Sequence, residues 1–463
     1  MKRIALNIED LFELRTATIF NPDEIKTIRN VTIDSRSVKK DSLFIAIRGK
    51  NYDGHSFVRQ AVKNGAGIAL INHNKLVEFD DIDLPIVTVK NTTKALGEIA
   101  KLWRKKLNTL VIALTGSSGK TSTKDIMAAL LSEKYKVQMT ESNNNNNIGV
   151  PLTILAANEK HDVLVAEVGT NHFGEVGYSA NILEPDYALI TNIGYSHLEH
   201  LKNRRGVLQE KKALYEAAMA KKGRIFVNYD DPLLKRFSPM YSDRITYGFD
   251  RRAEISGRVK SYTEDGRPIV EIIYKKKIIN NDLPLHGEQS ANNYLAAVSV
   301  ALKLGLSKNQ IKKGTEKLFV TNNRLNVKHF KDFILIDDTY NSNPDSAKYA
   351  IELVRKIKTY NRKVLILGDM FELGSGRLKF HRSLSTIIKR NMIDEVYSVG
   401  PGMKVLYESL TDKNIKTKHF RTRKSLGNFI KGYDPNKSVI LVKGSRGMRM
   451  EDFSNIFSHK AAD

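Results

Sequence analysis

A short glycine-rich segment has the residue types and spacing that bind a nucleotide triphosphate. Residues 116–121 read Gly-Ser-Ser-Gly-Lys-Thr. The two glycines let the backbone bend tightly and turn its amides towards phosphate oxygens. The Lys120 ammonium can neutralise the β- and γ-phosphates, and the Thr121 hydroxyl is the usual ligand for the accompanying Mg²⁺. The predicted ATP-binding residues of this loop are Gly116, Ser117, Ser118, Gly119, Lys120, Thr121 and Ser122.

The loop is shorter than the full phosphate-binding pattern. That pattern has a glycine four residues before Ser118, where this chain has Leu114. Short Gly/Ser turns followed by Lys-Thr also occur by chance. An apolar strand at 111–114 and a helical segment at about 121–133 flank this loop, however, and this context favours nucleotide binding. The short form also narrows the range of families to which the chain can belong.

Polar side chains follow two further apolar segments that we expect to be parallel strands. Glu167 ends the first and His197 follows the second. Because ligands bind beyond the carboxyl ends of parallel strands, both side chains can lie near the phosphate loop. Glu167 could ligate the same Mg²⁺ as Thr121, or it could be a solvated strand-end residue. A lone histidine in a loop is usually structural, but Glu199 and His200 nearby favour metal or phosphate chemistry.

Two lysines and three polar loops complete the candidate chemistry. Lys211 and Lys212 lie on a predicted helix, and by themselves they read as solvated helix lysines. The loops at 337–344, 368–374 and 443–447 each follow an apolar strand. Each could be only a turn. Together, on one face of one domain, they indicate a second surface for an anionic ligand.

The elements that must position these residues indicate an α/β protein. Between residues 91 and 318, apolar strands alternate with helical segments, which is typical of a mostly parallel, doubly wound sheet. A hairpin-like stretch interrupts this pattern at about 243–285. Residues 1–90 read as a small α/β unit, and residues 319–463 repeat the α/β rhythm of a Rossmann-like domain.

The amino-acid composition limits the kinds of molecule to which the protein can bind. The chain has 463 residues, no cysteine and a formal net charge of +24. The lack of cysteine excludes thiol catalysis and disulfides. The basic residues are spread in short clusters without a nucleic-acid-binding motif, so we expect a solvated surface that suits anionic small substrates and no nucleic-acid partner. No apolar stretch is long enough to cross a bilayer, so we expect a cytoplasmic protein without membrane insertion.

The chain resembles the Mur ligase family, and within it the enzymes that add D-alanyl-D-alanine to UDP-N-acetylmuramoyl-tripeptide. Each matching segment is weak alone, but their order along nearly the whole chain is specific. The segments are 34–36, 44–49, 53–55, 115–121, 145–151, 167–172, 192–199, 337–344, 368–374 and 443–447.

The resemblance implies three domains: a UDP-substrate-binding domain at 1–90, a central ATP-binding domain at 91–318 and a C-terminal Rossmann-like ligase domain at 319–463 that closes over the site. It implies that Lys211 carries a CO₂-derived carbamate able to hold a second Mg²⁺, although Lys212 leaves the register open. Gln289 and Ser290 depart from the usual adenine-side residues, and Ala213 replaces a frequent Glu.

The resemblance also implies roles for residues, by their numbers in this sequence. The catalytic residues are Lys120, His197 and Lys211. The metal ligands are Thr121, Glu167, His197 and carbamoylated Lys211. Beyond the phosphate loop, ATP contacts Asn293, Arg324 and Asp338. The substrate-binding residues are Ser35, Arg36, Arg48, Asp53, His55, Asn145, Asn146, Tyr340, Asn341 and Asn343.

The implied activity is ATP-dependent amide-bond formation by a monomer. The tripeptide carboxylate forms an acyl phosphate, and the amine of D-alanyl-D-alanine displaces phosphate, so no protein nucleophile is needed. Two alternatives remain at this point. One is a sister ligase that adds a diamino acid, or glutamate to a folate. The other is a basic P-loop ATPase acting on nucleic acid.

Overall fold

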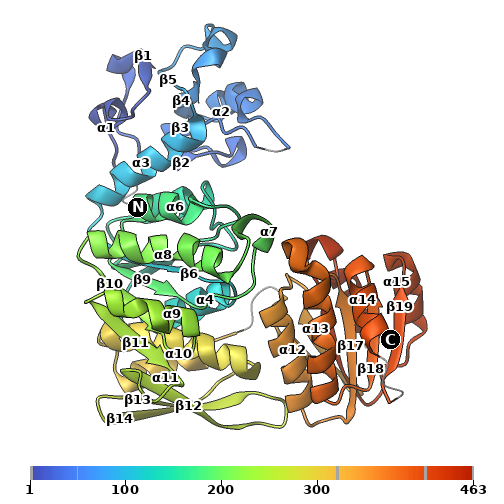
Figure 1. The fold of residues 1–463 in the computed structure, drawn as a ribbon. Helices are drawn as coiled ribbons and strands as arrows, with labels where there is room; N and C mark the ends of the chain where they lie inside the picture. Colours follow the sequence, from blue (N-terminus) through green and yellow to red (C-terminus); the bar gives the residue numbers. More distant parts are fainter. Residues whose placement is uncertain (1–3, 50, 320–322, 411–413, 461–463) are drawn as a thin grey trace.

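Three separate sheets follow one another along the chain in the computed structural model, which describes residues 4–49, 51–319, 323–410 and 414–460 (Figure 1). In the view of Figure 1 the N-terminal sheet lies above the central one, and the C-terminal sheet lies to the right of the central one. Helices accompany each sheet. The prediction of an α/β fold with a mostly parallel central sheet is confirmed.

The N-terminal sheet has five strands in the order β1-β5-β4-β3-β2, and β1 is antiparallel to β5 whereas the other pairs are parallel. Its elements are α1 (Ile8–Phe12), β1 (Thr18–Phe20), β2 (Val31–Thr32), β3 (Ser42–Ile45), α2 (Val58–Lys63), β4 (Ala66–Asn72) and β5 (Ile86–Val89).

The central sheet has nine strands in the order β14-β13-β12-β11-β10-β9-β6-β8-β7. The pairs from β7 to β12 are parallel, and β12, β13 and β14 form an antiparallel meander at one edge. The strands are β6 (Leu110–Thr115), β7 (Val137–Met139), β8 (Val163–Glu167), β9 (Tyr187–Ile190), β10 (Arg224–Asn228), β11 (Arg244–Gly248), β12 (Ile255–Tyr262), β13 (Pro268–Tyr274) and β14 (Lys277–Asp282). The predicted hairpin region is therefore correct from β12 onward, whereas β11 extends the parallel part.

Helices cover both faces of this sheet because the strands are apolar on both sides. Along β6, Val111 and Ala113 pack into one core, and Ile112 and Leu114 pack into the other, as strand alternation requires. The first core includes α3 (Thr92–Lys106), α5 (Gly149–Ala156), α6 (Glu175–Leu183) and α8 (Arg204–Ala220). The second includes α4 (Lys120–Leu131), α10 (Gly287–Lys303) and α11 (Lys308–Glu316). Two short helices, α7 (Leu198–Leu201) and α9 (Pro232–Phe237), lie in the connections.

The C-terminal sheet has the order β15-β16-β20-β17-β18-β19 and is parallel except for β15. Its elements are β15 (Asn326–His329), β16 (Phe333–Asp338), α12 (Pro344–Lys356), β17 (Arg362–Gly368), α13 (Arg377–Arg390), β18 (Glu395–Val399), α14 (Pro401–Ser409), β19 (Lys416–Phe420), α15 (Arg423–Gly432), β20 (Ser438–Lys443) and α16 (Glu451–Lys460). The four interior strands match the predicted ones. The two edge strands were not predicted, because edges accept lysine and other polar residues and lack an apolar run.

The N-terminal and central units share a hydrophobic core, whereas the C-terminal unit does not share it. The core that contains α3 runs without interruption from the N-terminal sheet to the central sheet. The C-terminal sheet has its own two cores, one on each face. It meets the central unit where α12 packs against α10. Across the described ranges, no helix is both long and apolar enough to span a bilayer.

Candidate active site

The phosphate loop connects β6 to α4 and requires glycine at its last position. Gly119 has a φ of 77°, in the left-handed region that side chains disfavour. A Cβ atom there would lie 2.2 Å from the side-chain oxygen of Asn293 on α10. Both constraints exclude a larger residue. The loop is thereby held against Asn293, the predicted adenine contact.

Asn192, just after β9, holds the first part of the loop. Its main-chain oxygen accepts the Ser117 amide and its Oδ1 accepts the Ser118 amide, each at 3.1 Å. These two amides therefore face Asn192 rather than a phosphate, contrary to the expectation that the whole loop turns its amides outward. The amides free to meet an anion are those of the first turn of α4, which begins at Lys120 and offers its positive dipole end.

Lys120 lies folded on this loop. Its Nζ donates to the Gly116 carbonyl at 2.8 Å. Burial lowers the pKa of Lys120 below its usual value, and the nearby Glu167 carboxylate opposes that shift. The ammonium thus lies over the loop that leads into the first turn of α4, where a phosphate would bind.

Two buried oxygens below the loop fit a hard divalent cation. The Thr121 hydroxyl and Glu167 Oε2 are buried and have no hydrogen-bond partner among the described residues. The other Glu167 oxygen accepts the Asn145 side-chain amide at 2.8 Å, which fixes the carboxylate. Since Mg²⁺ prefers carboxylate and hydroxyl oxygens, this donor set suits Mg²⁺.

His197 contacts the C-terminal domain. Its Nδ1 lies 2.6 Å from Glu372 Oε2, and the Glu199 amide donates to the Glu372 carbonyl at 3.2 Å. Burial lowers the pKa of His197, whereas Glu372 acts in the opposite direction. The imidazole therefore stands where the central and C-terminal domains meet.

Lys211 and Lys212 have opposite environments. Lys211 is 0% exposed, and its Nζ has no hydrogen-bond partner within the described part of the chain. Burial, together with the charge of Lys120, lowers the pKa of Lys211 well below its usual value. Lys212 instead pairs with Glu216 at 2.6 Å on the outer side of α8. Successive helix residues point about 100° apart, so only Lys211 faces inward.

The C-terminal domain supplies the opposite wall. Lys443 Nζ bridges Asp338 Oδ2 and the Asn341 carbonyl, at 2.5 and 2.9 Å. The Arg324 guanidinium stacks 3.8 Å above the Tyr340 ring. Asn343 caps α12 and donates its side-chain amide to the Ser117 carbonyl at 3.3 Å, which ties the wall to the phosphate loop.

These side chains surround one cavity of about 540 Å³. The predicted site residues that line it are Ser117, Ser118, Gly119, Lys120, Ser122, Asn145, Asn146, Glu167, His197, Asn293, Arg324, Asp338, Tyr340, Asn341 and Asn343. Thr121 and Lys211 are buried. Like Gly116, they are not among its lining residues.

The five predicted substrate residues of the N-terminal domain lie apart from this cavity: Ser35, Arg36, Arg48, Asp53 and His55. The two His55 ring nitrogens are already bonded, Nδ1 to Asp53 at 2.6 Å and Nε2 to the Asn72 amide at 3.0 Å. Arg36, by contrast, has a side chain that is 83% exposed and is paired with Asp34. Of this group, Arg36 is accessible to a ligand. His55 instead links the turn at Asp53 to the end of β4 at Asn72.

Three residues of the site were not predicted to be site residues, although two of them, Asn192 and Glu372, lie in segments that carry the resemblance. Asn192 was visible as a polar residue at a strand end, the same signal that identified Glu167. Glu372 and Asp345 act across the domain boundary: Glu372 contacts His197, and Asp345 accepts the Tyr195 amide at 2.9 Å. No local sequence pattern predicts contacts between residues of different domains.

Family models match most of the chain. They are the Mur ligase family catalytic domain at residues 27–104, the Mur ligase middle domain at 114–301 and the Mur ligase glutamate ligase domain at 323–446. The UDP-N-acetylmuramoyl-tripeptide–D-alanyl-D-alanine ligase of Bacillus subtilis is 33% identical over 456 residues, which cover 97% of each chain.

Solved structures agree with this result. The MurF structure from Acinetobacter baumannii has a TM-score of 0.86 at 29% identity, and the match covers 99% of this chain and 100% of that one. The MurF ligase of Thermotoga maritima, in complex with ADP, has a TM-score of 0.82 at 26% identity over 94% and 98% of the two chains. With its phosphate loop, its buried oxygens and its three-domain α/β fold, the chain belongs to the Mur ligase family of ATP-dependent ligases.

Proposed function

We propose that this chain joins D-alanyl-D-alanine to UDP-N-acetylmuramoyl-tripeptide with conversion of ATP to ADP and phosphate, a step of peptidoglycan precursor synthesis. One observation carries the proposal: the phosphate loop and the C-terminal wall share a single cavity, so nucleotide and amine can meet there. Near-full-length similarity to ligases of that name supports the choice of substrates.

The proposed division of labour follows the three units. Residues 1–90 hold the UDP end of the substrate through Ser35, Arg36, Arg48, Asp53 and His55. Residues 91–318 hold ATP. Residues 319–463 bring the amine through Tyr340, Asn341 and Asn343. We propose that the enzyme acts as a monomer, in the cytoplasm where ATP is available.

Two Mg²⁺ ions fit the donors of the site. Thr121 and Glu167 would hold the first, because each presents a buried oxygen that lacks a hydrogen-bond partner in the described chain. His197 and a carbamate on Lys211 would hold the second. Such ions, when bound, would neutralise the charge that develops on the transferred phosphoryl group.

Lys211 is chemically suited to carry that carbamate. A neutral amine attacks CO₂, forms the N–C bond and loses a proton. The lowered pKa of Lys211 supports this step, since it raises the neutral fraction of the amine. The resulting anion would also relieve the repulsion between Lys211 and Lys120.

The chain's own residues then orient the reaction. The tripeptide carboxylate attacks the γ-phosphorus, the bond to ADP breaks, and an acyl phosphate forms. Lys120 and the first-turn amides of α4 neutralise the phosphate oxygens. The amine of D-alanyl-D-alanine attacks the acyl carbon, phosphate leaves and the amine proton is lost. Asn343 holds the C-terminal wall against the loop during both steps.

One assay tests the proposal. Phosphate release is measured with ATP and UDP-N-acetylmuramoyl-tripeptide while the amine is varied: D-alanyl-D-alanine, single amino acids, or none. We expect turnover only with the dipeptide. Turnover with a diamino acid and the dipeptide precursor would identify a sister ligase instead. Phosphate release that nucleic acid stimulates, with a steep salt dependence, would indicate the unrelated ATPase.

A further inference from the structure

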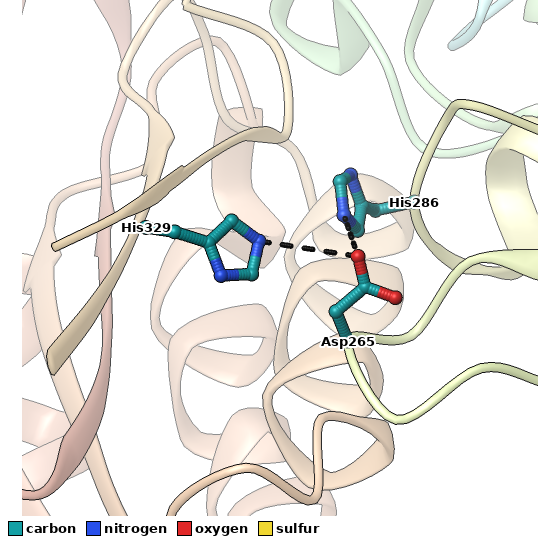
Figure 2. A group of neighbouring side chains, drawn as sticks. All are labelled: Asp265, His286 and His329. Atoms are coloured by element: carbon teal, nitrogen blue, oxygen red, sulfur yellow. Dashed lines mark ion pairs between the residues drawn. The ribbon is translucent and has the colours of Figure 1, made fainter. Parts of the chain in front are cut away.

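Three side chains from separate elements meet at the start of α10. Figure 2 shows Asp265, from the turn between β12 and β13, between His286 at the start of α10 and His329 at the end of β15. Asp265 Oδ2 lies 3.5 Å from His286 Nε2 and 3.9 Å from His329 Nε2. The three ligand atoms all lie within 4.8 Å of one another.

The environment of His286 points to a missing partner. The residue is 8% exposed, and neither ring nitrogen has a hydrogen-bond partner among the residues that the structure describes. Buried polar atoms are nearly always paired, because burying one without a partner costs about 1–3 kcal/mol. His286 Nε2 nevertheless points towards the carboxylate oxygen that His329 also faces (Figure 2).

We propose that Asp265, His286 and His329 bind a divalent transition metal ion of the Zn²⁺ class. Two imidazole nitrogens and one carboxylate oxygen are ligands that Zn²⁺, Co²⁺ or Ni²⁺ prefers, whereas Mg²⁺ prefers oxygen alone. Around a tetrahedral Zn²⁺ such donors lie about 3.3 Å apart. The half-exposed side chain of His329 can close the remaining distance and leaves a fourth position open to water.

Asp265 already has a cationic neighbour. Arg267 Nε lies 2.9 Å from the Asp265 Oδ2 atom, and the Thr263 hydroxyl donates to Oδ1 at 2.5 Å. The guanidinium therefore competes with the metal for the same oxygen. This arrangement predicts that removing the Arg267 charge tightens metal binding, an effect opposite to that of removing a ligand.

The site joins two domains. Asp265 and His286 belong to the central unit, and His329 belongs to the C-terminal sheet. Figure 1 shows the turn after β12 reaching α12, where the Lys358 amide donates to the Glu264 carbonyl at 2.8 Å. A bound ion would link the two units at this point and restrain their separation. This inference does not depend on the identity of the substrates.

The test is calorimetric titration of the full chain with ZnCl₂, in excess Mg²⁺ and a non-hydrolysable ATP analogue so that the nucleotide site is occupied. We expect one site that weakens at least about tenfold in His329→Asn and in Asp265→Asn. Arg267→Gln should bind more tightly than the parent. His459→Asn, which removes an exposed histidine of α16, is the matched control and should bind as the parent does.

Two further readouts support the design. Co²⁺ should give the visible absorption of a tetrahedral site in the parent and lose it in His329→Asn. Zn²⁺ should raise the thermal unfolding midpoint of the parent but not of that variant. Unfolding midpoints without metal show that each variant is folded. Undiminished Zn²⁺ affinity in both His329→Asn and Asp265→Asn would overturn the proposal, as would the absence of binding in the parent.

Discussion

Two lysines of the candidate site lie within reach of each other's charge: Lys211 is buried, and Lys120 is half-buried and lines the cavity. Burial lowers the pKa of both Lys120 and Lys211, and the charge of Lys120 lowers that of Lys211 further. Each lysine therefore costs free energy in the protein without ligands. An anion beside either one, whether phosphate or carbamate, removes that cost. The two lysines that raise the free energy of the protein without ligands are thus the residues that favour binding of anions.

Lys120→Ala should lower kcat for ATP-dependent ligation by at least about a hundredfold, because the developing phosphoryl charge loses its cation. Steady-state phosphate release with all three substrates measures this effect. Lys134→Ala, just beyond the other end of α4, is the control and should leave turnover near that of the parent. Near-normal turnover in Lys120→Ala would contradict the assigned role of the loop.

Lys211→Ala should be nearly inactive and should recover part of its activity when short-chain carboxylates are added, since these can replace the carbamate in the cavity left by the side chain. Lys212→Ala, which loses the pair with Glu216 and a contact with the Phe237 ring, should remain active. Activity is measured across a series of carboxylate concentrations. Rescue of the Lys212 variant but not of the Lys211 variant would show that the neighbouring lysine carries the modification.

At the scale of elements, a buried histidine joins α13 to the loop after β17. His381 Nε2 accepts the Met370 amide at 3.0 Å, and Nδ1 donates to the Arg377 carbonyl at 2.8 Å. The contact at Nε2 requires the neutral ring, because a protonated Nε2 cannot accept a hydrogen bond. Burial accordingly lowers the pKa of His381. The same segment carries Glu372, so this histidine positions the loop that contacts His197.

The folded-state pKa of His381 lies below the usual value of 6.5, so the unfolded chain binds the proton first as the pH falls. The free energy of unfolding should therefore decrease below about pH 6.5, by up to about 1.4 kcal/mol per pH unit for this group. Urea unfolding of the parent and of His381→Gln at pH 7.0 and 5.5 measures the contribution. The variant should show a shallower pH dependence, and an identical one would contradict this prediction.

Elements with strong local patterns were the predictable ones. The phosphate loop, its flanking strand and helix, and the interior strands of two sheets follow from apolar runs and glycine spacing. Strands β15 and β19 lie at sheet edges, where polar residues remove the signal. The turning of the Ser117 and Ser118 amides towards Asn192 was not predictable, because residues at least 74 positions apart make those bonds. The contact between Glu372 and His197 depends on how the domains pack together, so the residues around either position in the sequence do not predict it.

At the scale of the molecule, polar contacts around the cavity join the central and C-terminal domains, in addition to the packing of α12 against α10. Glu372 with His197, Asp345 with the Tyr195 amide, and Asn343 with the Ser117 carbonyl are three of them. Because such contacts are individually weak, we expect the domains to separate for substrate entry and product release. They also place the C-terminal wall whenever the domains close.

Glu372→Gln should lower kcat/KM up to about fivefold, since a partly exposed ion pair contributes about 0.2–1 kcal/mol. The thermal unfolding midpoint should hardly change, because the pair lies between domains rather than in a core. Glu408→Gln, an exposed residue of α14 in the same domain, serves as the comparison. Unchanged kinetics in Glu372→Gln would show that the contact does not contribute to closure.

The continuous core shared by the N-terminal and central sheets has a consequence for how the chain is made. When only the first 90 residues have left the ribosome, the sheet lacks α3, the helix that joins it to the core of the central unit. The face of the sheet that contacts α3 stays exposed to the cell until the central unit is synthesised, a period in which chaperones can bind it. The C-terminal unit, with cores of its own, completes its packing as soon as it emerges. The N-terminal unit therefore depends on the central unit to complete its folding, whereas the C-terminal unit folds last and on its own cores.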